Sequence, residues 1–131
     1  MLRRGGVLLL MMSALLLTGC TAREIVPKSG RYVMSAPAQA VFAPVVSLDA
    51  AEETFTFTYD LLSSYLPYGS YAQKDRFITC QTSDGRQSYV FRVVDENTLA
   101  FEAERSSAVA LIDARLGVAV GDGAVFSREN E

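Results

Sequence analysis

Thr54-Phe55-Thr56-Phe57-Thr58-Tyr59 is the stretch that decides the fold. Aromatic and threonine side chains alternate along it, so an extended chain carries three aromatic rings on one face and three threonines on the other. Residues 88–94 repeat this pattern, with Tyr89, Phe91 and Val93 on one face. Alternation with a period of two is typical of strands that are buried on one side, so both segments are predicted to be β-strands.

The same alternation recurs in shorter form along the rest of the chain. It predicts about eight strands, at residues 31–34, 45–48, 54–59, 70–72, 76–82, 88–94, 98–102 and 124–127. Ser83-Asp84-Gly85-Arg86 and Asp95-Glu96-Asn97 join three of them through short turns, which predicts an antiparallel meander. Residues 50–53 and 108–115 have some helical composition but are too short to show a helical period. We expect an all-β domain, a meander closed or nearly closed into a small lipocalin-like barrel, with a two-sheet β-sandwich as the alternative.

The N-terminal residues have the layout of an export signal. Arg3 and Arg4 precede an apolar run that begins at Val7 and ends at Leu17. A basic, then apolar, then small-residue order is typical of secretory signal peptides. The run has about half of the ~20 residues that a transmembrane helix needs, so a permanent span is not expected.

Leu17-Thr18-Gly19-Cys20, at the end of that run, resembles the lipobox of bacterial lipoproteins. In that family the cysteine thiol carries a diacylglyceryl group, the signal is cut before it, and the new amino terminus is often acylated. The resemblance implies lipidation of Cys20 and a signal peptide at 1–19. The short polar stretch that follows, which contains Pro27, predicts a lipidated tether at 20–29, with one domain at 30–131. Two or three acyl chains hold a protein at a membrane essentially permanently. The expected location is the cell membrane or outer membrane, with the domain outside the cytoplasm.

Charge and length limit the partners of the mature chain. Loss of Arg3 and Arg4 with the signal leaves 10 of the 12 Lys and Arg residues against 15 Asp and Glu, a net charge of −5. Nucleic acid and anionic lipid surfaces reward clustered Lys and Arg, so neither is an expected partner. The remaining length suits one domain. With Cys20 lipidated, Cys80 has no cysteine to pair with, and stability must come from burying apolar side chains.

Several strand and turn motifs carry a second resemblance. They are Phe55-Thr56-Phe57, the segment from Ser63 to Tyr71 (SSYLPYGSY), Thr82-Ser83-Asp84-Gly85 followed by Tyr89-Val90-Phe91, Leu99-Ala100-Phe101 and Ser106-Ser107. Over residues 30–126 the chain resembles a family of small uncharacterised bacterial lipoproteins, and a similar module occurs as an extracellular appendage on some membrane-bound antibiotic-sensing metallopeptidases. The resemblance implies a fold and an extracytoplasmic setting, and it assigns no functional residue. Cys80 departs from the pattern, which more often has an aliphatic residue there, so an inward, inert thiol is expected.

The residues that most catalytic sites require are missing or badly spaced. The chain has no histidine, which excludes Ser-His-Asp triads, Cys-His dyads and the common zinc sites. Cys80 shares the apolar side of its strand with Ile78, which favours a buried core thiol over a nucleophile. Glu102 and Glu104 are two residues apart, yet a solvated face explains them better than an acid and base pair. Asp113 and Asp122-Gly123 do not match a calcium loop. We therefore expect no catalytic residue, metal or cofactor, and a protein that is not an enzyme.

The candidate binding surface is the segment 61–72, with Tyr65, Tyr68 and Tyr71 among serine and glycine residues. We favour the interpretation that these rings fold over one end of the barrel and cover its core, although tyrosine with serine and glycine is also typical of adaptable recognition surfaces. We expect an interaction module that binds a protein, a peptide or another envelope component. The alternative is a lipocalin-like binder of a small ligand. An interior filled with side chains favours the first, and an internal cavity of roughly 300 Å³ or more with convergent polar groups favours the second.

Overall fold

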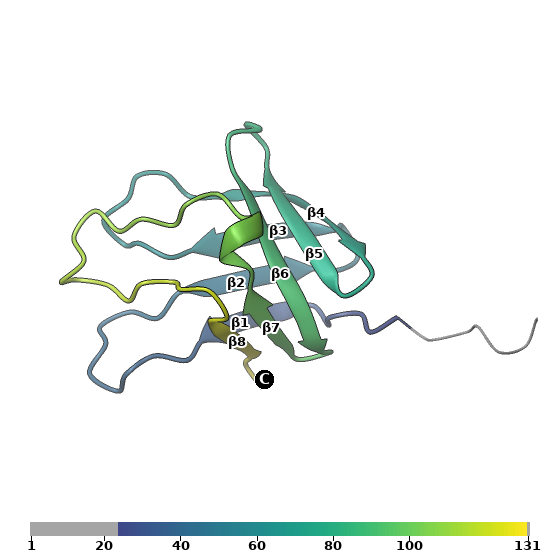
Figure 1. The fold of residues 1–131 in the computed structure, drawn as a ribbon, viewed down its shortest axis with the longest axis horizontal. Coiled ribbons are helices and arrows are strands. Elements are labelled where there is room, and N and C mark those ends of the chain that lie inside the picture. Colours follow the sequence, from purple (N-terminus) through teal and green to yellow (C-terminus); the bar gives the residue numbers. More distant parts are fainter. Residues whose placement is uncertain (1–23, 131) are drawn as a thin grey trace, which may run out of the picture.

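The computed structural model describes residues 24–130, so Cys20 and the expected signal peptide lie outside the described residues. Eight antiparallel strands pair in sequence order and close into a barrel (Figure 1). The strands are β1 (Gly30–Met34), β2 (Val45–Asp49), β3 (Thr54–Thr58), β4 (Tyr68–Lys74), β5 (Phe77–Thr82), β6 (Ser88–Asp95), β7 (Thr98–Phe101) and β8 (Val125–Arg128), with one short 3₁₀ turn, η1 (Ala103–Arg105), after β7.

The predicted eight-stranded barrel is confirmed, and the two-sheet alternative is not adopted. Closure depends on β1 and β8, where Tyr32 pairs with Arg128 and Met34 with Phe126. The predicted turn at Asp84-Gly85 joins β5 to β6, and Gly85 has the positive φ of 72° that favours glycine. Residues 50–53 form a turn, and residues 108–115 form no helix.

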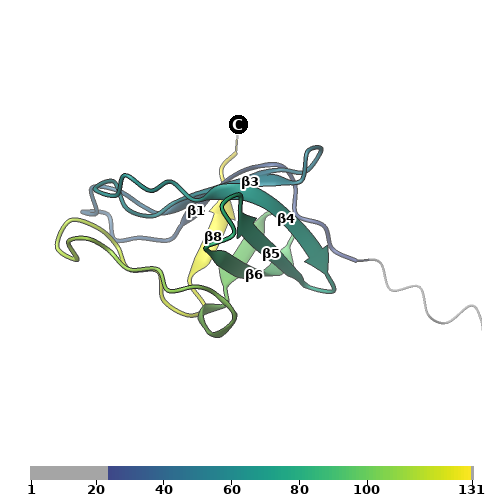
Figure 2. The same cartoon turned by 90° about the horizontal axis from the view of Figure 1, so that it is seen from above.

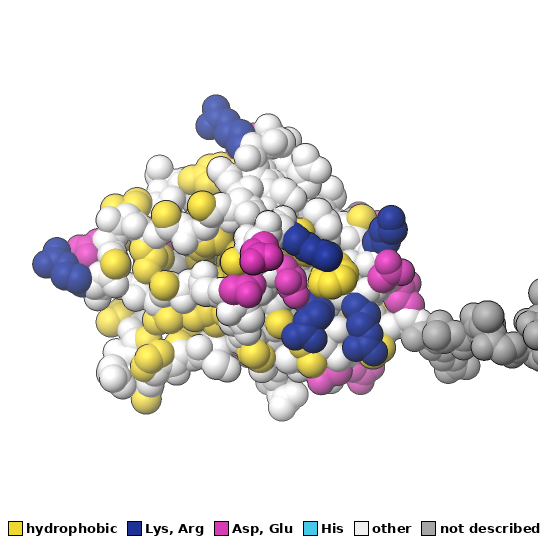
Figure 3. Space-filling view, viewed as in Figure 1, with side chains coloured by type: hydrophobic (Ala, Val, Ile, Leu, Met, Phe, Trp, Pro, Cys, Tyr) yellow, Lys and Arg dark blue, Asp and Glu magenta, His cyan; other side chains and the backbone are white. Residues whose placement is uncertain are grey.

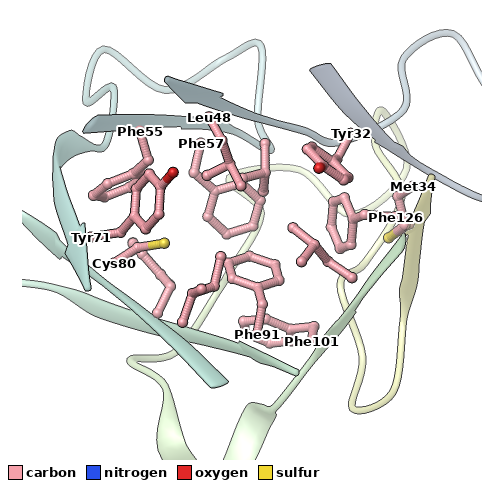
Figure 4. Packing of buried hydrophobic residues seen from close by; sticks show 14 of the residues in the cluster. Tyr32, Met34, Leu48, Phe55, Phe57, Tyr71, Cys80, Phe91, Phe101 and Phe126 are labelled. Carbon is pink, nitrogen blue, oxygen red and sulfur yellow. The ribbon is translucent and has the colours of Figure 1, made fainter. Parts of the chain in front are cut away.

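Aromatic side chains fill the interior of the barrel. Phe57 lies at its centre, with its ring 5.1 Å from the ring of Tyr89 and 5.7 Å from that of Phe91. Both contacts are edge-to-face, the arrangement that aromatic rings prefer. Figure 4 shows Phe55 and Tyr71 on one side of Phe57, with Tyr32, Met34 and Phe126 on the other. The buried cluster also contains Val46, Leu48, Ile78, Cys80, Val93, Leu99, Phe101 and Val120.

Short turns and the entering N-terminal segment lie at one end of the barrel, at the right of Figure 1. Pro27 is buried there, and Gln73 donates from Nε2 to the Ile25 carbonyl at 2.6 Å. The Tyr32 hydroxyl donates to the carbonyls of Lys28 and Glu96. The folded part therefore includes residues 25–29, which the sequence pattern assigned to the tether.

Three long connections lie together at the opposite end, at the left of Figures 1 and 2. They are residues 35–44, 59–67 and 102–124. Asp60 joins two of them, because its Oδ2 accepts a hydrogen bond of 2.8 Å from the Ile112 amide. Val41 is 90% exposed at this end, and Ile112 and Leu116 are also exposed. The barrel thus presents its long, largely apolar loops away from the end where the N-terminal segment enters.

Candidate functional site

The structure separates the three tyrosines of the predicted recognition segment. Tyr65 lies in the loop 59–67, whereas Tyr68 and Tyr71 belong to β4, which begins two residues before the predicted strand. Residues three apart on a strand point to opposite faces. Tyr68 is 58% exposed on the outside, while Tyr71 is 8% exposed and packs inside the barrel (Figure 4). Only Tyr65 and Tyr68 belong to a surface that could bind a partner.

The loop 59–67 is held in shape by its own polar side chains. Asp60 Oδ1 accepts a hydrogen bond of 2.9 Å from the Leu62 amide, and Ser63 Oγ accepts one of 3.1 Å from the Tyr65 amide. Such contacts between a side chain and the backbone two residues ahead stabilise turns. At the end of the loop the Pro67 carbonyl accepts from the Phe57 amide at 2.9 Å. The loop curls around a hollow of about 240 Å³ lined by residues 57–61, 63 and 65–67.

Tyr65 ties this loop to the turn between β5 and β6. Its hydroxyl donates to the Asp84 carboxylate at 3.1 Å. The same carboxylate accepts hydrogen bonds from the Arg86 amide at 2.9 Å and from the Thr82 hydroxyl at 2.7 Å. These donors, with the Arg86 amide first, lower the pKa of Asp84. Asp84 therefore holds together two segments that are far apart in the sequence.

A groove of about 620 Å³ runs along the outside of β2, β3 and β4, next to this loop. Leu66, which is 50% exposed, and Tyr68 form its apolar border. The other lining residues are Ser47, Leu48, Asp49, Thr54, Phe55, Thr56, Gly69, Ser70 and Ser83. Sequence alternation marks Thr54 and Thr56 as outward, but it gives no sign that this wall of the barrel is hollowed, because the hollow depends on how the strands twist past the loop.

The hydroxyl groups along the groove are available to a ligand. Among the described residues, the side chains of Ser47, Thr54, Thr56, Ser70 and Ser83 make no hydrogen bond within the protein, and neither does the Tyr68 hydroxyl. Free hydroxyls are not confined to the groove, because the side chains of Thr79, Thr98 and Ser127 also make no hydrogen bond to a described residue, whereas Ser106 Oγ accepts from the Val90 amide and donates to the Glu102 carbonyl. The groove also contains no Lys or Arg, and its one carboxylate, Asp49, accepts from the Ala51 and Glu52 amides through Oδ1.

One buried hydroxyl in the described part of the chain lacks a partner. Tyr89 is fully buried beside Tyr59 and Phe57, and its hydroxyl makes no hydrogen bond to a described residue. Burial and the neighbouring Tyr59 raise its pKa. This hydroxyl therefore stays protonated near neutral pH.

The structure does not assemble the catalytic groups that the sequence offered as candidates. Cys80 is fully buried, as expected, and burial raises the pKa of its thiol. Glu102 pairs with Arg92 at 3.5 Å, while Glu104 lies in η1 and not on a continuing strand. Within residues 24–130 no three His, Cys, Asp or Glu side chains gather closely enough to hold a metal ion. The two aspartates whose spacing does not match a calcium loop have other partners: Asp113 pairs with Arg115, and Asp122 accepts from the Ala103 amide.

Charged side chains gather on the wall of the barrel that faces away from the groove. Figure 3 shows basic and acidic side chains together over β6 and η1, and hydrophobic side chains over the long loops. On this wall Arg105 lies 4.2 Å above the Phe77 ring.

Within residues 24–130 no helix is long and apolar enough to cross a bilayer. Comparison of the chain with protein-family models, curated proteins and solved structures finds no match.

Proposed function

We propose that this chain is a lipid-anchored lipoprotein of the cell envelope whose barrel is a non-catalytic binding module. The signal layout and the lipobox-like Leu17-Thr18-Gly19-Cys20 support the anchor and a position outside the cytoplasm, at the cell membrane or the outer membrane. The partner is another envelope component. Nucleic acid is not a partner of a chain with this acidic balance.

The observation that carries the proposal is the contrast between a filled interior and a hollowed outer wall. Phe57 and its aromatic neighbours occupy the centre of the barrel, where an internal ligand would lie. The groove of about 620 Å³, by comparison, is within the size range of ligand sites and is bordered by exposed Leu66 and Tyr68. Together these features support an outer binding surface over a lipocalin-like internal site.

The geometry of the two ends supports a tethered module. The N-terminal segment enters at the end that carries the short turns, fixed there through Ile25, Pro27 and Lys28. A lipid on Cys20 would hold this end toward the membrane. The groove and the loop 59–67 then remain open to partners in the surrounding envelope.

Two measurements test the proposal in intact cells. Wild-type protein should fractionate with membranes and carry lipid on residue 20, whereas a Cys20→Ala variant should keep its signal and carry none. A photo-crosslinking amino acid at position 68 should then trap an envelope component, while the same group at exposed Val94 of β6, on the charged wall, should trap much less. Unlipidated wild-type protein, or equal trapping at both positions, would contradict the proposal.

A further inference from the structure

We propose that the outer groove over β2, β3 and β4 binds a neutral glycan, a chain of uncharged sugar rings. This inference rests on the proposed binding function and names the chemistry of its ligand. The groove combines an exposed aromatic ring, Tyr68, with five unused hydroxyls and one carboxylate. Sugar rings need both kinds of group, because they have apolar C–H faces and a rim of hydroxyls.

The Tyr68 ring supplies the surface on which a sugar face can rest. It lies on the outside of β4, at the border of the groove and next to Leu66. The face of an aromatic ring carries partial negative charge and attracts the partially positive C–H groups of a sugar. A tyrosine also loses little conformational entropy when it orders against a ligand, since it has only two side-chain torsions.

The hydroxyls supply the polar contacts. Thr54 and Thr56 point outward from β3, and Ser70 points outward from the paired strand β4. Thr54 pairs directly with Ser70, and Thr56 with Tyr68, so the groups form two rows along the groove. Each hydroxyl can donate one hydrogen bond and accept two, which suits a ligand whose own hydroxyls do the same.

The charge of the groove excludes ligands that are anionic. No Lys or Arg lines it, so a phosphate or a carboxylate on the ligand would find no counter-charge. The single carboxylate, Asp49, has Oδ1 occupied by the Ala51 and Glu52 amides and leaves Oδ2 for a ligand hydroxyl. A neutral, hydroxyl-rich ligand fits these groups.

Two other classes of ligand fit less well. A peptide that binds as an added strand needs a free sheet edge, and the eight described strands form a closed barrel without one. A lipid chain would match the largely apolar surface of the groove, but it would cover the hydroxyls of Thr54, Thr56 and Ser70 without giving them partners, which is unfavourable. The groove therefore selects for sugar chemistry among the components of an envelope.

The test uses the full lipidated chain in lipid nanodiscs and calorimetric titration with two neutral probes, chitohexaose and cellohexaose. A third arm measures co-sedimentation with purified cell-wall sacculi. We expect at least one hexasaccharide to bind, with a dissociation constant below about 1 mM. Binding to sacculi alone would contradict a neutral ligand, because the glycan strands of sacculi also carry charged peptide stems.

Variants separate a ring contact from a structural effect. Tyr68→Ala should weaken binding by about tenfold or more, and Tyr68→Phe by less than about threefold, because the phenylalanine keeps the ring. Thr56→Val keeps the shape of the side chain and removes its hydroxyl, so it should weaken binding by about threefold to tenfold. Val94→Ala, on the charged wall, is the matched control and should change nothing.

Failure of both hexasaccharides to bind, or binding that Tyr68→Ala leaves unchanged, would overturn the glycan inference. That result is distinct from failure of the proposed function, because the crosslinker at position 68 reports an occupant of any class. A protein trapped at position 68 without glycan binding would leave a binding module with a different ligand.

Discussion

Gly69 of β4 lies so close to Gln81 of β5 that a Cβ atom at position 69 would stand 2.1 Å from the Gln81 carbonyl oxygen. The contact is with backbone and not with a flexible side chain, so the two strands would have to separate. Gly69→Ala should therefore lower the free energy of unfolding by roughly 3 kcal/mol, at the upper end of overpacking costs. Urea unfolding measures this, with Gly121→Ala as the control because a Cβ there meets nothing within 4 Å. Equal stabilities of the two variants would show that the strands can adjust.

Phe57 should be the most sensitive position in the core. Its ring contacts those of Tyr59, Tyr89 and Phe91, and it is fully buried. Phe57→Ala removes a large side chain that its neighbours cannot replace and should cost about 3–5 kcal/mol of folding free energy. Tyr68→Ala removes a ring of similar size from the surface, and its effect should stay within about 0.5 kcal/mol. Comparable losses for the two variants in denaturant unfolding would contradict the assignment of Tyr68 to the outer wall.

The strands were predictable from sequence because alternation survives in most of them, although Leu99, Ala100 and Phe101 of β7 are all buried. Thr54–Thr58 and Ser88–Asp95 carry this pattern most clearly, and the short turn at Gly85 fixes the hairpin between β5 and β6. Closure was predictable only as the usual solution for eight strands, since the pairing of β1 with β8 joins residues from opposite ends of the domain.

The binding surface was less predictable than the fold. Because β4 begins two residues earlier than expected, Tyr68 and Tyr71 lie on the same strand and point to opposite faces, Tyr68 outward and Tyr71 inward. The predicted segment also omitted Thr54, Thr56 and Ser47, which come from other strands. Their shared groove depends on the twist of the barrel and on the position of Leu66, and neither follows from a local pattern.

Cys80 should resist chemical modification in the folded protein. It is fully buried, and burial raises the pKa of its thiol, so almost no reactive thiolate is present near neutral pH. A Cys20→Ala variant leaves Cys80 as the only thiol, because the chain has two cysteines. Iodoacetamide labelling followed by mass spectrometry should find it unmodified in buffer and fully modified in concentrated urea. Rapid labelling in buffer would place the thiol near the surface.

Acid should release the contact between Tyr65 and Asp84. The Arg86 amide, the Thr82 hydroxyl and the Tyr65 hydroxyl all stabilise the charged carboxylate and lower its pKa. A group with a lowered pKa in the folded state contributes stability above its unfolded pKa and loses that contribution as the pH falls through the folded pKa. A titration of the Asp84 carboxyl by NMR should give a pKa below the ordinary value of about 3.9. Tyr65→Phe should move it upward by removing one donor, and an unchanged pKa would mean that Tyr65 does not hold the loop in solution.

Alkali should destabilise the barrel through Tyr32. Its hydroxyl is buried against the carbonyls of Lys28 and Glu96, and burial raises its pKa from 10.0 to about 12. A group whose pKa is raised in the folded state contributes its full stability below its unfolded pKa. That contribution is lost as the pH rises from about 10 toward 12, because the unfolded chain releases the proton first.

Urea unfolding of the wild type should therefore show stability falling more steeply above pH 10 than that of Tyr32→Phe, which has no proton to release. At pH 7 the same variant should be less stable by about 1 kcal/mol, because it leaves two carbonyls without this donor. Tyr68→Phe changes an exposed hydroxyl and should be as stable as the wild type at pH 7. Tyr32 joins the N-terminal segment to the turn after β6, so loss of its proton should first free residues 25–29. The Lys28 amide, which donates to the Glu96 carbonyl, reports on this step. Its hydrogen exchange should rise beyond the ordinary base-catalysed increase before the rest of the barrel opens. Simultaneous loss of protection at Lys28 and at the core strands would mean that this segment and the barrel unfold as one unit.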